Sequence, residues 1–504
     1  MKRYLSLWFM AFIPFMLIAQ NNGNGAVNKS FDELRKSLMN DFQKSKKGME
    51  EEFQSFRQKV MQEYIDFVRK AWAPFEKREP VPVPKEKPLP PVVVPDEIKV
   101  LPIDDKPMPI KGILPPINIM PQPQPQPIEP IEEIFVEVEK SFPFTFFGTE
   151  AKVRFDVADK VVLKGVSEKH VADALERMSK DSHENLIVDC LSLRDVHSLS
   201  DWAYINMLDA LSKKIYGNDV NSATLLMAYI YMQSGYKMRF ATDKTRLYML
   251  YASMHNVYEL PCFVVDDVRY YSLEELPLRL NISSASYEKE TPLSLIVATN
   301  QKFAYKPAAE HHVKSHDYPD FAIDVIVNEN LLDFYKNFPT SMVGENMYSR
   351  WAIYANTPTD VEIAETLYPQ FKEMLDGLSE LDAVNRILNL VQTGFEYKYD
   401  DDVWGGDRIF FPDECFYYSY NDCDDRSVLF SRLVRDIMGL DACLVFVPGH
   451  VLVGVEFKEN VKGSFVMIGN RKFVLCEPTC TNGAPVGWSE VKDDADLNVY
   501  LLER

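Results

Sequence analysis

Three side chains near the C-terminus have the types and the order needed for thiol chemistry. Cys423, His450 and Glu477 follow one another at intervals of 27 residues. The nucleophilic form of cysteine is the thiolate, and an imidazole oriented by a carboxylate can take the proton from the thiol. The three residues are therefore a candidate nucleophile, base and orienting acid.

The sequence after Cys423 predicts a helix that begins at the cysteine. Apolar residues recur at helical spacing over residues 428–437, and Gly439 is typical of a helix C-terminus. At the N-terminus of such a helix, backbone N–H groups and the positive end of the dipole favour an anion, so a catalytic Cys423 is expected to react fast well below pH 8. Asp422 and Asp424 would oppose the thiolate if both were charged, and we expect them to cap the helix.

The other two residues of the candidate triad belong to predicted strands. Residues 442–447 form an apolar run, residues 448–449 are Pro-Gly, and a second strand opens at His450. A further strand at 472–476 would bring Glu477 to the second ring nitrogen of the imidazole. A carboxylate there fixes the tautomer of the histidine.

This order resembles the transglutaminase-like superfamily, which shares a papain-like core. The motifs that carry the resemblance are Asp-Cys-Asp-Asp before an apolar helix, Pro-Gly-His with a Val-Gly-Val tail, and Glu-Pro-Thr before a Gly-Trp pair, within roughly residues 380–490. The resemblance implies an α+β fold in which Cys423 is the nucleophile, His450 the general base and acid, and Glu477 the orienting acid. Asn421 stands where many members have glycine, and Glu477 where the best-known members have aspartate.

The expected activity is attack of a thiolate on an amide carbonyl of a peptide or protein, through a thioester. Related bacterial families are more often hydrolytic, which favours hydrolysis over crosslinking. The oxyanion would be held by the Cys423 backbone N–H and a second donor, for which Tyr420 and Trp404 are candidates. With Asp422 and Asp424, these two residues are expected at the substrate cleft, although Trp404 could simply lie at a surface turn.

Neither a cofactor nor a metal is expected. The alternative to an enzyme is a cell-envelope scaffold that binds peptides or supports assembly, with Cys423 a structural buried thiol and His450 a satisfied core histidine.

Length and composition predict several domains with real cores. The chain has 504 residues, 46% hydrophobic and 12% aromatic, which is enough for about two to four domains. The net charge of −20 argues against binding to nucleic acid and to anionic membrane surfaces. Seven cysteines leave at least one thiol without an intramolecular partner. Cys476 with Cys480 and Cys190 with Cys262 are candidate pairs, and Cys423 is the natural free thiol.

The N-terminal segments predict export and a stalk. Residues 1–20 have the charged start and apolar run of a signal peptide, with an uncleaved anchor as the alternative. We expect a periplasmic or extracellular protein with no transmembrane span after cleavage. Over residues 21–79 apolar residues recur every 11 positions, which predicts a long amphipathic helix that forms a homo-oligomer, folds back or grips a partner. Residues 80–131 form a proline-rich linker, expected as an extended spacer.

Two similar domains are expected after the linker. Residues 301–504 would hold the Cys-His-Glu triad, and residues 132–300 would be a degenerate copy. In that copy Val220 takes the position of the cysteine, Arg246 or Leu247 that of the histidine, and the segment 263–267 parallels the one that ends at Glu477. An ordinary succession of helix and strands is the alternative.

Between the two expected copies, His311, His312 and His316 are expected on a solvated loop rather than at a metal site. Residues 321–327 and 347–354 are expected as strands and residues 360–395 as helices.

Overall fold

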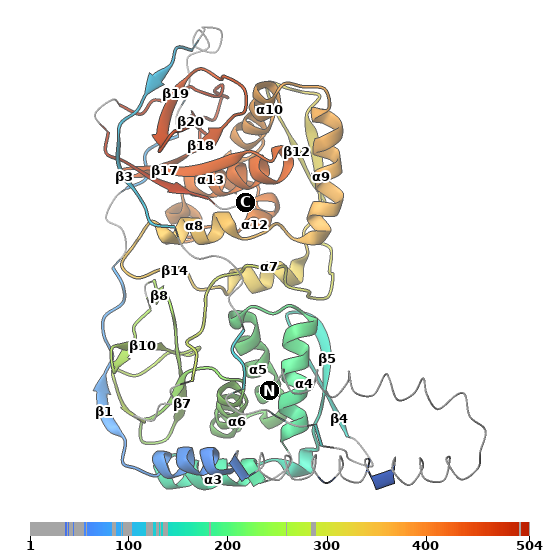
Figure 1. Ribbon diagram of the computed structural model, residues 1–504, viewed down its shortest axis with the longest axis vertical. Coiled ribbons are helices and arrows are strands. Elements are labelled where there is room, and N and C mark those ends of the chain that lie inside the picture. The colour runs from blue at the N-terminus through green and yellow to red at the C-terminus, as the bar shows by residue number, and fades with distance from the viewer. Residues whose placement is uncertain are drawn as a thin grey trace, which may run out of the picture. The chain divides into compact units, whose positions relative to one another are not determined.

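The computed structural model describes most of residues 58–502 (Figure 1). Within this range it leaves out residues 83–86, 92, 94–102, 117–123, 128–130, 132, 135–139, 181–182, 259, 284–288 and 493–494, and before it describes only residues 36, 37, 39, 44, 55 and 56. The expected signal peptide and most of the 11-residue repeat therefore lie outside the described residues. The chain divides into two units, residues 1–64 and 65–504, and the elements below belong to the second.

The helix at the start of the second unit is shorter than expected. It ends at Val68, whose carbonyl accepts a hydrogen bond from Nε1 of Trp72 at 3.2 Å. Strand β1 (Ala73–Glu76) follows and pairs antiparallel with β11 (Arg279–Ile282). The prediction of a helix through residue 79 is wrong at this end, because Pro74 disfavours helical backbone at the residue before it and cannot donate a helical hydrogen bond.

A first α+β region follows the proline-rich segment. It opens with the antiparallel hairpin of β4 and β5 and continues through four helices into a sheet with the strand order β1-β11-β6-β7-β10-β9. Its further elements are β4 (Ser141–Phe146), β5 (Thr149–Arg154), α3 (Glu168–Lys180), α4 (Glu184–Val196), α5 (Asp201–Tyr216), α6 (Val220–Gln233), β6 (Met238–Thr242), β7 (Leu247–Ala252), β9 (Phe263–Val265) and β10 (Val268–Tyr271).

The middle of the chain differs from its prediction in two places. His311 and His312 lie on a strand of an antiparallel hairpin, not on a loop, and residues 349–356 are helical where a strand was expected. The helices expected over residues 360–395 are confirmed. The elements are β8 (Asn256–Val257) paired with β14 (Ser341–Met342), β12 (His311–Lys314), β13 (Ala322–Val325), α7 (Glu329–Lys336), α8 (Ser349–Asn356), α9 (Val361–Leu375) and α10 (Glu380–Thr393).

The C-terminal region places helix α13 against a curled sheet (Figure 1). The helix begins at Cys423, continues as a π-helix from Val434 and ends at Gly439, which adopts the left-handed conformation typical of a helix end. Among the strands, the helix packs mainly on β18. The elements are α11 (Asp400–Val403), α12 (Pro412–Tyr417), α13 (Cys423–Leu433), β17 (Asp441–Val447), β18 (His450–Glu456), β19 (Ser464–Ile468), β20 (Arg471–Cys476) and β21 (Leu497–Leu501).

The proline-rich segment is not merely a spacer, because it completes this sheet. Strand β2 (Lys106–Pro107) pairs parallel with β19 at one edge, and β3 (Ile110–Ile113) pairs parallel with β21 at the other. Because only Met108 and Pro109 separate β2 from β3, the two edges come together and the seven-stranded sheet curls into a near-barrel. Met108 is 4% exposed and belongs to the core inside the sheet.

The two sheets share one topology. In each, a helix precedes the first strand, and the five following strands of the sheet are ordered last, first, second, fourth, third: β11-β6-β7-β10-β9 and β21-β17-β18-β20-β19. By this order the counterpart of β20 is β10, not the strand from Phe263 to Val265. Common origin of the two copies stays a prediction, and the shared order is what a duplication would produce.

The fold is therefore mixed α+β, with curled sheets and helices packed against them. Among the residues that the structure describes, no helix is both long enough and apolar enough to cross a bilayer. All seven cysteines are buried and unbridged, so the candidate pairs Cys476–Cys480 and Cys190–Cys262 do not form.

Candidate active site

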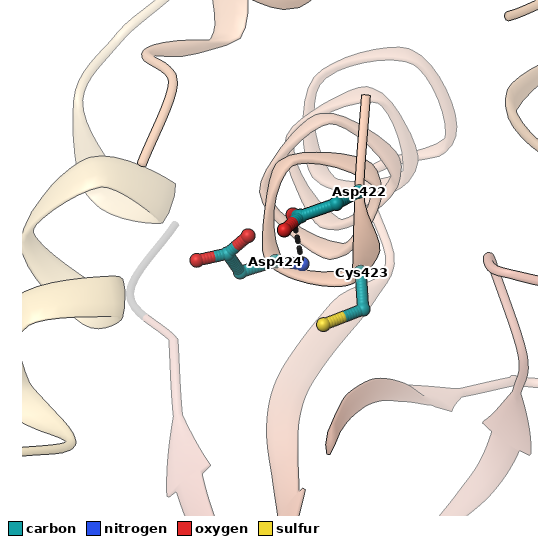
Figure 2. Close-up of side chains that lie close together, drawn as sticks. All are labelled: Asp422, Cys423 and Asp424. Carbon is teal, nitrogen blue, oxygen red and sulfur yellow. Dashed lines mark hydrogen bonds between the residues drawn. The ribbon is translucent and has the colours of Figure 1, made fainter. Parts of the chain in front are cut away.

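Cys423 occupies the first position of α13, as its sequence predicts. Asp422 is the N-cap, and its carboxylate accepts a hydrogen bond from the Asp424 backbone N–H at 3.2 Å (Figure 2). The Asp425 carboxylate returns to the Asp422 N–H at 3.3 Å, which completes a capping box. The capping role expected of Asp422 is confirmed.

His450 and Glu477 meet through the first residue of β18 and the residue that follows β20. The two Glu477 carboxylate oxygens lie 3.1 and 3.0 Å from Nε2 of His450. Thr479 holds the same carboxylate with its backbone N–H at 3.2 Å and its hydroxyl at 2.5 Å. The acid is thus fixed on one nitrogen of the ring by donors that come from its own loop.

The thiol of Cys423 interacts with this histidine. Nδ1 of His450 is buried and forms no hydrogen bond of ordinary length and angle. Nevertheless, the ring and the thiol affect each other, since His450 lowers the pKa of Cys423 and Cys423 raises the pKa of His450. We read this as a close approach of sulfur and ring without an aligned hydrogen bond, which is common in catalytic pairs before substrate binds.

The protonation of the three groups follows from burial and charge. Burial lowers the pKa of His450, but Glu477 and the thiol outweigh it and raise the pKa well above its usual value. Burial raises the pKa of Glu477, and the charged ring and Thr479 lower it overall. Both shifts favour the imidazolium–carboxylate form of the pair.

The thiol is not activated in the way expected from its helix position. Burial raises the pKa of Cys423, and the neighbouring Asp424 adds to the rise, so that the opposing effects of His450 and of the Val451 backbone N–H do not compensate. Only 8% of the residue is exposed. This direction of the pKa shift is opposite to the one that the helix position favours, because the helix N-terminus is buried among acids. Fast reaction of Cys423 well below pH 8 stays a prediction.

These acids surround the nucleophile. Burial and the charge of Asp424 raise the pKa values of Asp422 and Asp425 well above the usual range, and burial raises the pKa of Asp400 to about 8. All three shifts favour the protonated form of these carboxyls. Asp424 is held by Nε1 of Trp351, which donates to its carboxylate at 2.7 Å.

Asp422, Cys423 and Asp424 could offer one ligand atom each, all within 4.8 Å of one another (Figure 2). Both carboxylates already accept hydrogen bonds, from the backbone N–H groups of Asp424 and Asp425 and from the Trp351 indole. Capping and the Cys423–His450 approach account for the cluster, and no metal is needed to explain it.

Two buried residues that the sequence reasoning missed connect the elements of the site. Arg426 donates to the carbonyls of Gln392 at 2.9 Å and Phe395 at 2.8 Å, which ties α13 to the end of α10. Gln392 donates in turn to the Glu477 carbonyl at 2.8 Å. Neither residue lies in a motif that sequence alone would single out, whereas the Thr479 contact lies within the Glu-Pro-Thr motif.

The two aromatic candidates for the cleft lie in a separate cluster. Trp404 packs edge to face on Tyr418 with ring centroids 5.3 Å apart, and the Arg408 guanidinium lies 4.1 Å from the centre of the indole. Tyr420 lies near both aromatic rings. Within the described part of the chain, no hydrogen bond or ring contact joins Trp404 or Tyr420 to Cys423, His450 or Glu477.

Comparison of the chain with protein-family models, with curated proteins and with solved structures finds no match in any of the three. The functional argument therefore depends on the chain's own residues and their geometry.

Proposed function

We propose that this protein is a cysteine-dependent enzyme with a transglutaminase-like, papain-like site that acts on amide bonds of peptides or proteins, by hydrolysis more than by crosslinking. Cys423 is the nucleophile, His450 the base and acid, and Glu477 the residue that orients and charges the ring. The observation that carries the proposal is the double contact of Glu477 with one ring nitrogen while the thiol interacts with the same ring from a helix N-terminus.

The reaction begins when the Cys423–His450 pair loses one proton. The thiolate adds to the amide carbonyl, the C–N bond breaks, and the imidazolium gives its proton to the leaving amine. The neutral ring then takes a proton from water as the oxygen attacks the thioester, and the C–S bond breaks to release the acid. Glu477 stays charged throughout and stabilises the imidazolium each time it forms.

Site-resolved alkylation with iodoacetamide tests the proposal. The rate at Cys423 should rise with pH through 9, because burial raises the thiol pKa, and it should exceed the rates at Cys262 and Cys443 in the same sample. His450→Ala should slow Cys423 selectively. The matched control is His312→Ala, since that histidine is exposed on β12. Equal Cys423 rates in the wild type and in His450→Ala would rule out a catalytic pair.

A peptide-binding or assembly scaffold is the second candidate, because the first sheet repeats the topology without the chemistry. Helix α6 begins at Val220, and the strand corresponding to β18 begins at Leu247, whose N–H donates to Asn221 Oδ1 at 2.9 Å. Arg246 pairs there with Glu274 at 2.7 Å. A Cys423 that alkylates no faster than the other buried thiols would favour this candidate. Export and association through the N-terminal helix remain parts of both proposals.

A further inference from the structure

The first turn of α13 has one backbone donor to spare. Asp424 N–H is bound by the Asp422 carboxylate at 3.2 Å and Asp425 N–H by the Asp424 carboxylate at 3.0 Å. Within the residues that the structure describes, the Cys423 N–H has no acceptor. When the sulfur adds to a carbonyl carbon, the negative charge develops on the oxygen of that carbonyl, and this N–H is a donor at the nucleophile itself. A single donor does not make an oxyanion hole, and a second one is required.

Tyr397 lies beside the nucleophile on a short parallel ladder. Strand β15 (Glu396–Tyr397) pairs with β16 (Tyr420–Asn421), and Tyr397 is opposite Asn421, two residues before Cys423. On the other side of the cysteine, the Arg426 guanidinium lies 5.1 Å from the centre of the Tyr397 ring. Residues on either side of Cys423 in the sequence thus hold Tyr397, Asn421 through the backbone ladder and Arg426 through the ring.

The Tyr397 hydroxyl is buried and has no hydrogen-bond partner. A buried O–H without an acceptor is unfavourable in the free protein, and such groups call for an explanation. Burial raises the pKa of Tyr397, and the charge of Cys423 and that of Asp422 raise it further. Because its pKa is shifted upward, the phenol keeps its proton and can donate a hydrogen bond.

We propose that the Tyr397 hydroxyl and the Cys423 backbone N–H together form the oxyanion hole of this site. The thiolate adds to the carbonyl carbon, the C=O electrons move onto oxygen, and both donors bind that oxygen until the C–N or C–O bond to the leaving group breaks. An O–H without an acceptor in the free protein gains one only when the oxyanion forms, which is the differential binding that accelerates a reaction. The assignment rests on the proposed thiol chemistry.

Tyr420 and Trp404 were the second donors expected from the sequence, and the indole N–H of Trp404 is also buried without a partner. Its ring, however, packs with Tyr418 and Arg408, whereas Tyr397 pairs beside Asn421 and is influenced by the thiol. The position beside the nucleophile therefore favours Tyr397. Trp404→Phe is accordingly the matched control for Tyr397→Phe.

Two reagents separate an oxyanion donor from a residue that only supports the site. Acylation of Cys423 by p-nitrophenyl acetate passes through an oxyanion, whereas alkylation by iodoacetamide displaces iodide directly and forms none. In the full-length chain Tyr397→Phe should slow acylation by at least tenfold, and by about a hundredfold if the donor matches others of its kind, while the alkylation rate and its pH profile stay within twofold. Trp404→Phe should change neither rate.

The outcomes are distinguishable. Equal slowing of acylation and alkylation in Tyr397→Phe would mean a structural role, and unchanged acylation would mean no role; either result overturns the assignment. Removing an unpartnered hydroxyl should leave the urea midpoint equal or higher, so unfolding cannot be the cause of a loss. If wild-type Cys423 is neither acylated nor alkylated faster than the other thiols, the proposed function itself fails, and the assignment fails with it.

Discussion

Glu477→Gln is the substitution that tests the protonation of the site most directly. The carboxylate oxygens lie 3.0 and 3.1 Å from Nε2 of His450, and the side chains of Glu477 and His450 are 2% and 8% exposed. The glutamine amide has the same size and can accept the same N–H hydrogen bond, but it carries no charge. The variant therefore removes the reason for the ring to stay positive at neutral pH while it keeps the contact.

The size of the effect follows from the distance. Opposite unit charges about 3 Å apart at an effective dielectric constant of about 20 attract each other by roughly 5 kcal/mol. The retained hydrogen bond and the smaller desolvation cost of a neutral partner return about half of this, which leaves about 2–3 kcal/mol. Because the imidazolium stabilises the thiolate beside it, up to this amount is lost from the nucleophile, or roughly tenfold to a hundredfold in its rate.

The measurement is the rate of carbamidomethylation of Cys423, followed by mass spectrometry of its peptide from pH 6 to 10. Glu477→Gln should be roughly tenfold to a hundredfold slower than the wild type at pH 8, since the positive charge beside the sulfur is lost. Glu456→Gln is the control, because Glu456 lies on β18, the strand that His450 begins, but pairs with Arg471 at 2.9 Å. A Glu477→Gln rate profile that overlays the wild type would refute the charge assignment to His450.

Two further predictions concern the fold around the site. Met108→Ala should lower the free energy of unfolding in urea by about 2–4 kcal/mol, because Met108 is 4% exposed inside the near-barrel. The control Ile113→Ala, at a side chain 53% exposed, should lower it by less than about 1 kcal/mol. Equal losses would mean that residues 106–113 do not close the sheet. Asp400→Asn should flatten the pH dependence of stability: burial raises the Asp400 pKa to about 8, so the folded state binds an extra proton between about pH 4 and 8 and wild-type stability falls as pH rises through that window. Relative to the wild type, the free energy of unfolding of the variant should be roughly 1–3 kcal/mol more favourable at pH 8 than at pH 5. The same slope of unfolding free energy against pH in both proteins would contradict this.

Local patterns predicted the immediate surroundings of the triad. The helix start at Cys423, the glycine that ends the helix at Gly439 and the turn at residues 448–449 all follow from neighbouring residues. The Val-Gly-Val motif also has a packing reason. A Cβ at Gly454 would lie 2.7 Å from Sγ of Cys443 and 3.0 Å from Cβ of Phe473, so only glycine fits between the strands.

What the sequence could not reveal depends on contacts between distant segments. Composition predicts an extended proline-rich segment, but not that Lys106 pairs with Ser464 and Ile110 with Leu497. The protonation of Cys423 was missed for a similar reason. Its helix position favours an anion, but the burial that outweighs this effect, and the approach of Asp400 to the same acids, come from tertiary packing.

The register of the central strands links the barrel closure to the chemistry. His450 begins β18 and Glu477 follows β20, and these strands pair with Val453 opposite Cys476. Side chains alternate between faces along a strand, so a slip of one residue between β18 and β20 would move the carboxylate to the wrong side of the sheet. Strand β20 is held on its other side by β19, which in turn is covered by β2 from the proline-rich segment. A segment that lies in the chain between the first strand of the first sheet and the remaining strands of that sheet thus helps to fix the distance between base and acid in the second sheet. Residues 301–504 alone should therefore fold with an open edge and a looser His450–Glu477 contact.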